Sequence, residues 1–159
     1  MIVHTLGREV WLPKPLDQVF DFFSRAENLE QITPPWIRFR ILTRRPIQMK
    51  QGAVIRYALR IRGIPFRWLT QIERWDPPHE FIDVQVKGPY KVWRHTHRFS
   101  AVDGGTSVAD IVEYSLPFGA LGRLLHRILV ARDVERIFDY RNERIQRLFT
   151  TGTIEDASG

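Results

Sequence analysis

The sequence predicts an α+β fold in which an antiparallel sheet of six to seven strands packs against one long C-terminal helix, with two short helices after the first strand. Between residues 36 and 116, apolar residues recur at every second position, which is typical of strands with one buried face. Between residues 119 and 149 they recur at helical spacing, and arginines occupy the opposite face. The chain has 159 residues, of which 43% are apolar, so we expect one domain over residues 1–149 and a flexible tail over residues 150–159.

The N-terminal part is expected to hold one strand and two short helices. Residues 2–12 alternate weakly and end at Pro13, which predicts the first strand. A helix is expected after Pro15, because proline suits the first helical turn and apolar residues crowd into residues 19–23. A second short helix is expected over residues 26–32. It should end there, because Thr33, the residue before Pro34, is disfavoured in the helical conformation.

The alternating segments that follow predict six strands, over residues 36–42, 55–62, 66–72, 81–87, 91–102 and 106–116. Asp103-Gly104-Gly105 is typical of a hairpin turn between the last two. If this turn closes around residues 103–106, Asp110 faces Phe99 and lies within diagonal reach of His97. The helical segment would span about 45 Å if unbroken, so we expect it to lie across the sheet.

Composition excludes several classes of protein. There is no cysteine, which excludes disulfides, Cys-ligated zinc, iron–sulfur clusters and thiol catalysis. The 24 basic and 18 acidic residues give a net charge of +6, but the arginines are scattered among apolar residues, as on solvent-facing strands and helices, so we expect no nucleic-acid partner. No phosphate-binding loop and no Gly-x-Ser-x-Gly motif occurs.

No apolar run approaches the roughly 20 residues of a membrane-spanning helix. Residues 1–5 lack the basic and apolar regions of a signal peptide. We therefore expect a cytoplasmic protein without integral membrane association.

The segment over residues 91–99 carries the most suggestive chemistry. With a period of two, His95 and His97 share one face with Trp93 and Phe99, while arginines occupy the other face, so both imidazoles should point inward. Buried imidazoles need partners, and Asp110 is the expected one. His95, His97 and Asp110 are therefore candidates for an interior polar network, a polar anchor for a ligand, or a catalytic acid–base group, because imidazole titrates near neutrality.

Two imidazoles at His-x-His spacing also raise the question of a metal. A third ligand is needed, and Asp110 or Glu113 could supply it. No ligand spacing supports such a site, so we expect neither a metal nor another cofactor. His4, His79 and His126 are isolated in the sequence and are expected to be structural or exposed.

Alternation also predicts which residues face the space between sheet and helix. The same pattern fits a filled core, so the sequence leaves a cavity and plain packing as alternatives, and Pro46 and Met49 lie in a loop that could form a rim. The predicted lining residues are Tyr57, Leu59, Ile61, Trp68, Thr70, Val84, Val86, Trp93, His95, His97, Phe99, Asp110 and Tyr114 from the strands and Phe118, Leu121, Leu125 and Ile128 from the helix.

Several local sequences resemble one superfamily: Asn28-Leu29 through Ile32-Thr33-Pro34-Pro35-Trp36, Gly88-Pro89-Tyr90 with Trp93, His95, His97 and Phe99, Asp110 with Val112 and Tyr114, and Pro117-Phe118-Gly119. They resemble the START-like SRPBCC superfamily, in its bacterial polyketide cyclase/dehydrase-like or ligand-binding branch. The resemblance covers nearly the whole chain. It implies the helix-grip fold, in which a curved sheet grips the long helix and leaves a cavity for an apolar or aromatic ligand.

Three functions remain open. The preferred prediction is a protein that binds a hydrophobic small molecule, lipid-like or aromatic, between the sheet and the helix. The first alternative is an aromatase/cyclase-like or dehydratase-like enzyme that uses the candidate catalytic residues together with Tyr114. The second alternative is an interaction module that docks an arginine-rich face on an anionic membrane or partner. The sequence leaves monomer and homodimer open. The arginine-rich face of the predicted interaction module consists of Arg38, Arg40, Arg56, Arg60, Arg62 and Arg67.

Overall fold

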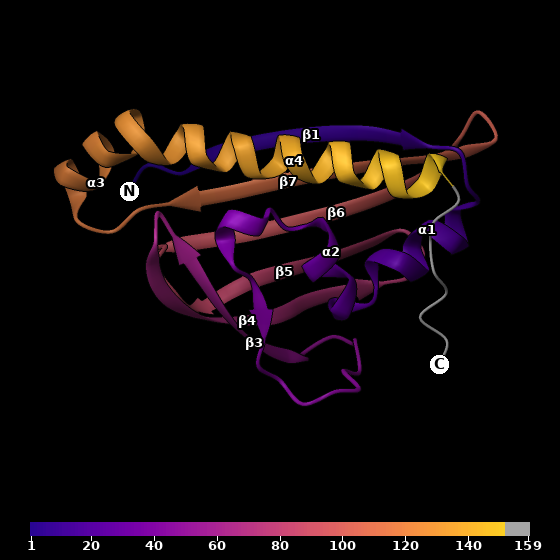
Figure 1. Cartoon of the computed structure of the whole chain (residues 1–159), viewed down its shortest axis with the longest axis horizontal. Helices are drawn as coiled ribbons and strands as arrows, with labels where there is room; N and C mark the ends of the chain where they lie inside the picture. The colour runs from indigo at the N-terminus through magenta and orange to yellow at the C-terminus, as the bar shows by residue number, and fades with distance from the viewer. Residues whose placement is uncertain (152–159) are drawn as a thin grey trace.

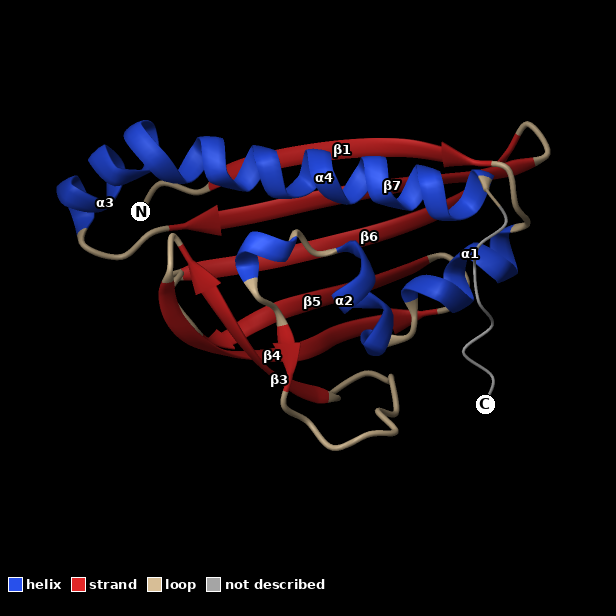
Figure 2. Cartoon of the chain, viewed as in Figure 1, coloured by secondary structure: helices blue, strands red, loops and turns tan. Residues whose placement is uncertain are grey.

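A computed structural model describes residues 1–151, which form a seven-stranded antiparallel sheet with helices on one face (Figures 1 and 2). Along the sheet the strands follow the order β1-β7-β6-β5-β4-β3-β2, so the first strand pairs with the last. The predicted fold class is confirmed, and residues 152–159 of the predicted tail lie outside the described residues. The elements are β1 (His4–Leu12), α1 (Leu16–Phe23), η1 (Ala26–Asn28), α2 (Leu29–Ile32), η2 (Pro35–Ile37), β2 (Arg40–Ile41), β3 (Val54–Ile61), β4 (Ile64–Asp76), β5 (Glu80–Lys87), β6 (Val92–Val102), β7 (Gly105–Ser115), α3 (Gly119–Leu125), η3 (His126–Val130) and α4 (Ala131–Thr150).

The second strand is much shorter than the alternation over residues 36–42 predicts. Pro35–Ile37 forms a turn of 3₁₀ helix, and Arg38 adopts a left-handed backbone conformation with φ of 48°. A left-handed residue cannot continue an extended strand. Only Arg40 and Ile41 therefore pair with β3.

The hairpin between β6 and β7 is tighter than expected. Asp103 and Gly104 both have positive φ, at 50° and 75°, which is the pattern of a two-residue type I′ turn. Val102 therefore pairs directly with Gly105. This register places Asp110 opposite His97 rather than opposite Phe99, which corrects the expected pairing.

The C-terminal helix runs through α3, η3 and α4, with η3 as a π-helical segment. Figure 1 shows α4 lying along β1 and β7. Val134, Phe138, Ile145 and Leu148 form its buried stripe, and Arg141 occupies a position within the same stripe. A charged residue at such a position must find compensation in the interior.

The far edge of the sheet curls back to the helix. Arg62 at the tip of the β3–β4 hairpin donates hydrogen bonds from Nε and Nη2 to the two carboxylate oxygens of Asp133 on α4, at 2.7 and 2.9 Å. Two parallel hydrogen bonds fix orientation as well as distance. The sheet and the helix therefore enclose the space between them from both edges.

The largest cluster of buried apolar residues lies at one end of the molecule, where α1 and the end of α4 meet the sheet. Phe20, Phe23, Phe99 and Phe149 form a cluster of edge-on, tilted and stacked rings with centroids 5.2–6.5 Å apart. Aromatic pairs in such geometries contribute beyond the area that they bury. The largest part of the apolar core thus lies at the α1 end of the sheet. None of the helices within residues 1–151 is long and apolar enough to cross a membrane.

Replacing Ile145 tests this core. Ile145 is fully buried on α4, so Ile145→Ala should lower the free energy of unfolding by about 2–5 kcal/mol through lost contacts and the cavity left behind. The matched change Ile128→Ala, at an exposed position of the same long helix, should change it by about 0.5 kcal/mol or less. Chemical denaturation measures both, and equal effects would contradict the placement of the core.

Candidate functional site

The two histidines of β6 face the interior between carboxylates from both neighbouring strands. In the sheet, His95 pairs with Asp83 of β5, and His97 pairs with Asp110 of β7. All four residues project from the same face of the sheet, where His95, His97 and Asp110 are buried and Asp83 is nearly so. The sheet register therefore assembles the cluster.

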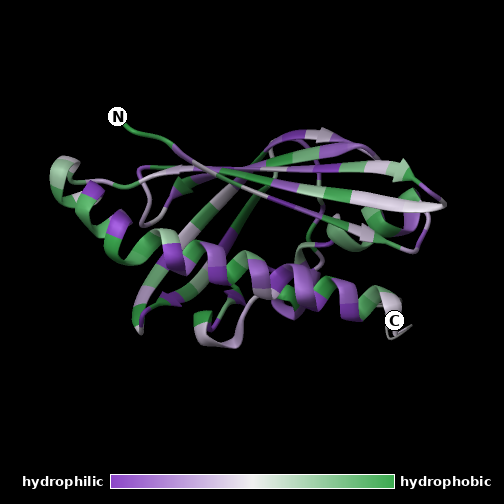
Figure 3. Ribbon diagram, turned by 90° about the horizontal axis from the view of Figure 1, so that it is seen from above, coloured by the Kyte–Doolittle hydropathy of each residue, from purple (hydrophilic) through white to green (hydrophobic). Residues whose placement is uncertain are grey.

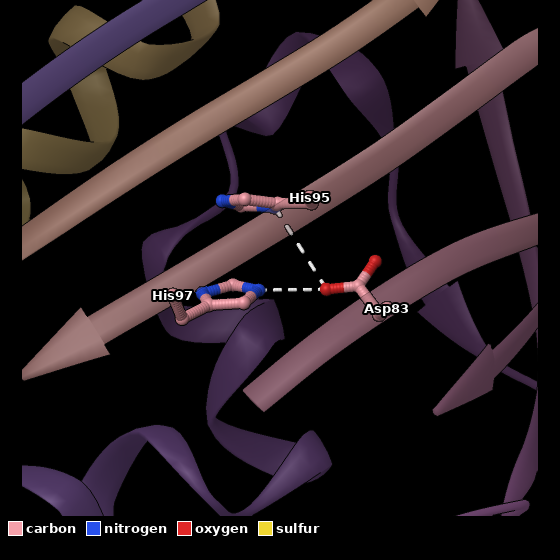
Figure 4. Close-up of side chains that lie close together, drawn as sticks. All are labelled: Asp83, His95 and His97. Carbon is pink, nitrogen blue, oxygen red and sulfur yellow. Dashed lines mark hydrogen bonds and ion pairs between the residues drawn. The ribbon is translucent and has the colours of Figure 1, made fainter. Parts of the chain in front are cut away.

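The contacts form a closed network. His97 donates from Nε2 to Oδ2 of Asp83 at 2.6 Å, and His95 donates from Nε2 to Oδ1 of Asp110 at 2.7 Å. Nδ1 of His97 lies 3.3 Å from the same oxygen of Asp110, without hydrogen-bond geometry. Nδ1 of His95 lies 3.9 Å from Oδ2 of Asp83 (Figure 4).

Aromatic rings fix both imidazoles. Their rings stack on each other with centroids 3.7 Å apart, and Phe81 stacks on the other face of His97 at 4.0 Å. Phe138 of α4 meets His95 edge-on at 5.3 Å. The imidazoles are thus held in place by stacking in addition to their hydrogen bonds.

Arg141 brings a positive charge from α4 to the same site. Its Nε lies 3.5 Å from Oδ2 of Asp110. The side chain is buried, and neither Nε nor Nη2 has a hydrogen-bond partner among the described residues. A buried guanidinium with free donors can bind an acceptor that enters the site.

The two carboxylates are ionised. Burial opposes the charge of Asp110, but Arg141 and the two histidines hold its pKa well below the usual range. Burial also opposes the charge of Asp83, and the hydrogen bond from His97 with the nearby histidine and Arg141 charges still lowers its pKa. An ionised carboxylate can only accept hydrogen bonds, so Nε2 of both histidines carries a proton.

The pKa values of the two histidines are shifted in opposite directions. Burial and the charge of His97 lower the pKa of His95 to about 4. Burial opposes a charge on His97 as well, but its contacts with Asp110 and Asp83 outweigh burial and raise its pKa. Below the raised pKa of His97, its charge and that of Arg141 balance the two carboxylates, and neutral His95 keeps a lone pair on Nδ1.

The network forms one wall of a cavity of about 180 Å³ between the sheet and the helices. A cavity of about 150 Å³ accepts benzene, so this space suits a compound of one ring with a short substituent. The phenol of Tyr57 lies on the wall, and burial first and the charge of Asp83 second raise its pKa, which keeps it protonated. The wall consists of Phe22, Phe23, Arg25, Ala26, Asn28, Leu29, Ile32, Thr33, Ile37, Phe39, Met49, Ile55, Tyr57, Leu59, Ile61, Trp68, Thr70, Ile72, Phe81, Asp83, Tyr90, Trp93, His95, His97, Ile137, Phe138 and Arg141.

Many of the lining residues expected from the sequence lie on this wall. They come from β3, β4 and β6, whose alternation is unambiguous. The loop residue Met49 also lies on the wall, whereas Pro46 does not. The predicted residues on the wall are Tyr57, Leu59, Ile61, Trp68, Thr70, Trp93, His95 and His97.

The expected faces of β5 are reversed. Phe81 and Asp83 line the cavity, whereas Val84 and Val86 point to the outer face. In register, Val84 lies beside Arg94, and the long arginine stem can cover apolar surface there. The outer face of β5 therefore carries apolar residues without facing the core.

Three other predicted residues lie near the cavity without lining it. Phe99 belongs to the aromatic core, and Asp110 lies behind the histidines as their acceptor. Tyr114 is buried and joins a hydrogen bond of 2.8 Å with Nε2 of His126. His126 and His4 stack with centroids 3.4 Å apart, so neither is isolated.

The helical residues expected to close the cavity do not reach it. Phe118, Leu121, Leu125 and Ile128 are exposed and absent from its wall. They precede α4, which is the part of the long helix whose buried stripe packs on the sheet. Ile137, Phe138 and Arg141 of α4 close the cavity instead.

Sequence reasoning missed Asp83 and Arg141. Asp83 lies in a strand whose other face is more apolar, so alternation favours the wrong face. Arg141 follows Phe138 by three residues and precedes Ile145 by four, so helical spacing places it in the buried stripe. That spacing is the signal that could have identified it.

Asp83, His95 and His97 are also the residues that could hold a metal ion. One ligand atom from each lies within 4.8 Å of the others, so the third ligand would be Asp83 rather than Asp110 or Glu113. Metal binding would have to break the hydrogen bond between His97 and Asp83. The absence of a metal from this site stays a prediction.

The turn before β6 is braced by one side chain. Gln85 donates from Nε2 to the carbonyl oxygen of Tyr90 at 2.7 Å and accepts from its backbone N–H at 3.1 Å. Gly88 lies against the Gln85 side chain, and glycine suits this position because a Cβ would overlap that side chain. The brace positions Tyr90 and Trp93 on the cavity wall.

A family model described as polyketide cyclase / dehydrase and lipid transport matches residues 12–149. The chain belongs to this family. No curated protein matches it. The match agrees with the resemblance to the START-like SRPBCC superfamily, which is confirmed.

Solved structures share the helix-grip fold of this cyclase/dehydrase family member. A START superfamily protein from Mycobacterium smegmatis is 14% identical with a TM-score of 0.67, over 91% of this chain and 99% of that one. Major latex-like protein 151 from Panax ginseng is 13% identical with a TM-score of 0.67, over 93% and 98%. Protein Ms6760 from Mycobacterium smegmatis is 17% identical with a TM-score of 0.68, over 93% and 92%. At these identities the likeness shows the fold alone.

The opposite shifts of the two histidines can be measured by NMR titration. We expect His95 to stay neutral until the pH falls to about 4 and His97 to stay charged above the ordinary value of about 6.5. Asp83→Asn should lower the pKa of His97, because it removes a negative charge and an ionic acceptor. Asp17→Asn, at an exposed position on α1, is the matched control and should leave both signals unchanged.

The same shifts predict how stability depends on pH. The contribution of His95 to the free energy of unfolding is fully present above about pH 6.5 and is lost as the pH falls toward 4. The contribution of His97 is complete below about pH 6.5 and is lost as the pH rises through its raised pKa. Chemical denaturation of His95→Gln should show a weaker loss of stability in acid than the parent, and His97→Gln a weaker loss in alkali. Parallel curves for the variants and the parent would contradict the assignment.

Proposed function

We propose that the chain binds a small, mainly apolar molecule that carries a carbonyl-type acceptor at one end. The observation that supports this proposal is the guanidinium of Arg141 on the wall of a mainly apolar cavity, where its Nε and Nη2 have no hydrogen-bond partner among the described residues. With His97 protonated the network balances its charges, so a neutral acceptor enters without adding an uncompensated buried charge. The family's description, polyketide cyclase / dehydrase and lipid transport, agrees with a ligand of this kind.

Size and shape favour an aromatic ring for the apolar part. Trp68, Tyr90 and Trp93 meet at edge-on or tilted angles with centroids 4.8–5.7 Å apart on the cavity wall. Such rings offer faces and edges to a flat ligand. Acetophenone, one ring with a short ketone substituent, is the corresponding probe.

The acceptor is tested with a matched pair of probes. Acetophenone should bind about tenfold or more tightly than its hydrocarbon isostere α-methylstyrene, because a hydrogen bond to a charged group contributes roughly 1.5–3 kcal/mol. Arg141→Lys keeps the positive charge beside Asp110 but removes the planar fork, so it should abolish this preference. Ligand titrations followed by NMR measure both affinities, and equal affinities in the parent would contradict the proposal.

Filling the cavity tests the location of the ligand. Leu59→Trp places extra volume on the wall and should abolish binding of both probes. Leu69→Trp is the control, because Leu69 lies between Trp68 and Thr70 on β4 and points away from the cavity. If both variants bind equally well, the ligand lies elsewhere.

The free lone pair on His95 favours a second candidate function, proton abstraction next to a bound carbonyl. Nδ1 would take the proton, the electron pair of the C–H bond would form a C=C bond, the π pair of the carbonyl would move to its oxygen, and Arg141 would stabilise the charge that develops there. The base is then His95, because its lowered pKa keeps it neutral, whereas the raised pKa of His97 favours its protonated form, which cannot accept a proton.

Hydrogen exchange tests this reaction without knowledge of a natural product. In D₂O the protein should catalyse exchange of the methyl protons of acetophenone, with a rate that rises as the pH passes about 4. His95→Gln should abolish the exchange while NMR still detects binding. Exchange that survives in His95→Gln, or none in the parent despite binding, would exclude this candidate and leave the binding function intact.

A further inference from the structure

The first part of the long helix presents an apolar face to solvent. Leu121, Leu124, Leu125 and Ile128 recur at the spacing of one helical face, with exposed fractions of 57, 52, 38 and 58%. Phe118 precedes them and is 76% exposed. We call these five residues the α3 face. A contiguous exposed apolar surface of this kind commonly marks an interaction site.

The orientation of this face is fixed by contacts on the other side of the helix. Gly122 is buried, and a Cβ there would overlap the carbonyl oxygen of Pro117. His126 is held by its hydrogen bond to Tyr114 and by stacking on His4. The helix is therefore anchored through Gly122 and His126, and the α3 face points away from the body. Figures 1 and 3 show α3 projecting beyond the end of the sheet, beside the N-terminus.

The backbone at Phe118, just before α3, is strained. Phe118 adopts a left-handed conformation with φ of 71°, which is strained for an aromatic residue. Such strain commonly occurs at functional sites. Here it accompanies a side chain that packs against little of its own protein.

The charged side chains of the segment that carries the α3 face have one sign. Residues 114–132 contain no aspartate or glutamate but include Arg123, Arg127 and Arg132. None of these arginines forms an ion pair with another described residue. Apolar side chains flanked by unpaired arginines are typical of helices that lie on anionic bilayers.

We propose that the α3 face docks on an anionic membrane surface, with its apolar side chains among the lipid headgroups and its arginines on the phosphates. A second copy would bring the same arginines against each other, and like charges oppose that contact. A protein partner would need a groove shaped for a projecting convex helix, whereas a bilayer accepts such a helix directly. The arginine-rich face predicted from the sequence differs from this one, because it lies on β2–β4 and the turns beside them, and its Arg62 is paired with Asp133.

Vesicle co-sedimentation tests the proposal. The full chain should bind vesicles of phosphatidylcholine mixed with phosphatidylglycerol and bind pure phosphatidylcholine far more weakly, with affinity that falls as salt rises. The variant Leu124→Gln/Ile128→Gln should lose roughly tenfold or more in affinity through lost apolar burial. Arg123→Gln/Arg127→Gln should lose about fivefold per arginine.

Matched controls separate this face from the rest of the surface. Val54→Gln/Ile64→Gln changes two equally exposed apolar residues elsewhere, and Arg60→Gln/Arg67→Gln changes two arginines of the sequence-predicted face. Both should bind vesicles as the parent does, and so should Leu59→Trp, whose cavity is filled.

Three outcomes would overturn the proposal. The first is absence of vesicle binding or equal binding to neutral vesicles. The second is loss of binding in Arg60→Gln/Arg67→Gln with retention in Arg123→Gln/Arg127→Gln. The third is a concentration-dependent dimer that disappears in Leu124→Gln/Ile128→Gln, which would assign the α3 face to a second copy. Analytical ultracentrifugation measures the last of these.

Discussion

Two ionised carboxylates in the interior constrain the rest of the structure. A buried charge is tolerated only when opposite charges and hydrogen bonds compensate it. Asp110 takes its compensation from Arg141 on α4 and from both histidines of β6, and Asp83 takes most of its compensation from His97. The sheet register at β5–β6–β7 brings the carboxylates and histidines together, and the contact of Arg141 with Asp110 orients α4 about its own axis.

That rotation determines which residues enclose the cavity. With Arg141 directed at Asp110, Phe138 one turn earlier meets His95, and Ile137 completes the helical part of the wall. The polar end of the cavity is therefore built by the same contacts that hold the helix on the sheet. A ligand that reaches Arg141 meets groups that are already in position, which reduces the entropy lost on binding.

The cavity also requires an apolar core elsewhere. Residues around an open space lose contacts on one side, and this lowers stability. The aromatic cluster around Phe20, Phe99 and Phe149 lies at the α1 end and makes the dense contacts that the centre lacks. Phe23 and Phe81 belong to this cluster and also to the cavity wall, so the core supports the wall from the α1 end.

The sequence shows the elements because alternation and helical spacing are local properties. It shows the inward direction of His95 and His97 because arginines mark the opposite face of β6. The sequence does not show the inward direction of Asp83, because the stems of arginines on the outer face of the sheet allow the outer face of β5 to carry apolar residues. It fails for Phe118 and Ile128 because periodicity identifies one face of a helix but does not show whether anything covers it. The tight turn after Val102 shifts the pairing of β6 with β7 from the expected register, and composition alone does not determine the size of this shift.

The protonation states rank the two functions that the cavity supports. A general base works best when its pKa lies near the working pH, because a base of much lower pKa has little affinity for the proton. Burial lowers the pKa of His95 to about 4, so at neutral pH it is always available as a base but is a weak one. Its reaction therefore depends on a carbonyl that Arg141 has already polarised, whereas binding of that carbonyl needs no help from His95. For this reason we propose binding as the primary function of the site, with proton abstraction as a secondary step for a ligand whose C–H bond is acidified by the polarised carbonyl.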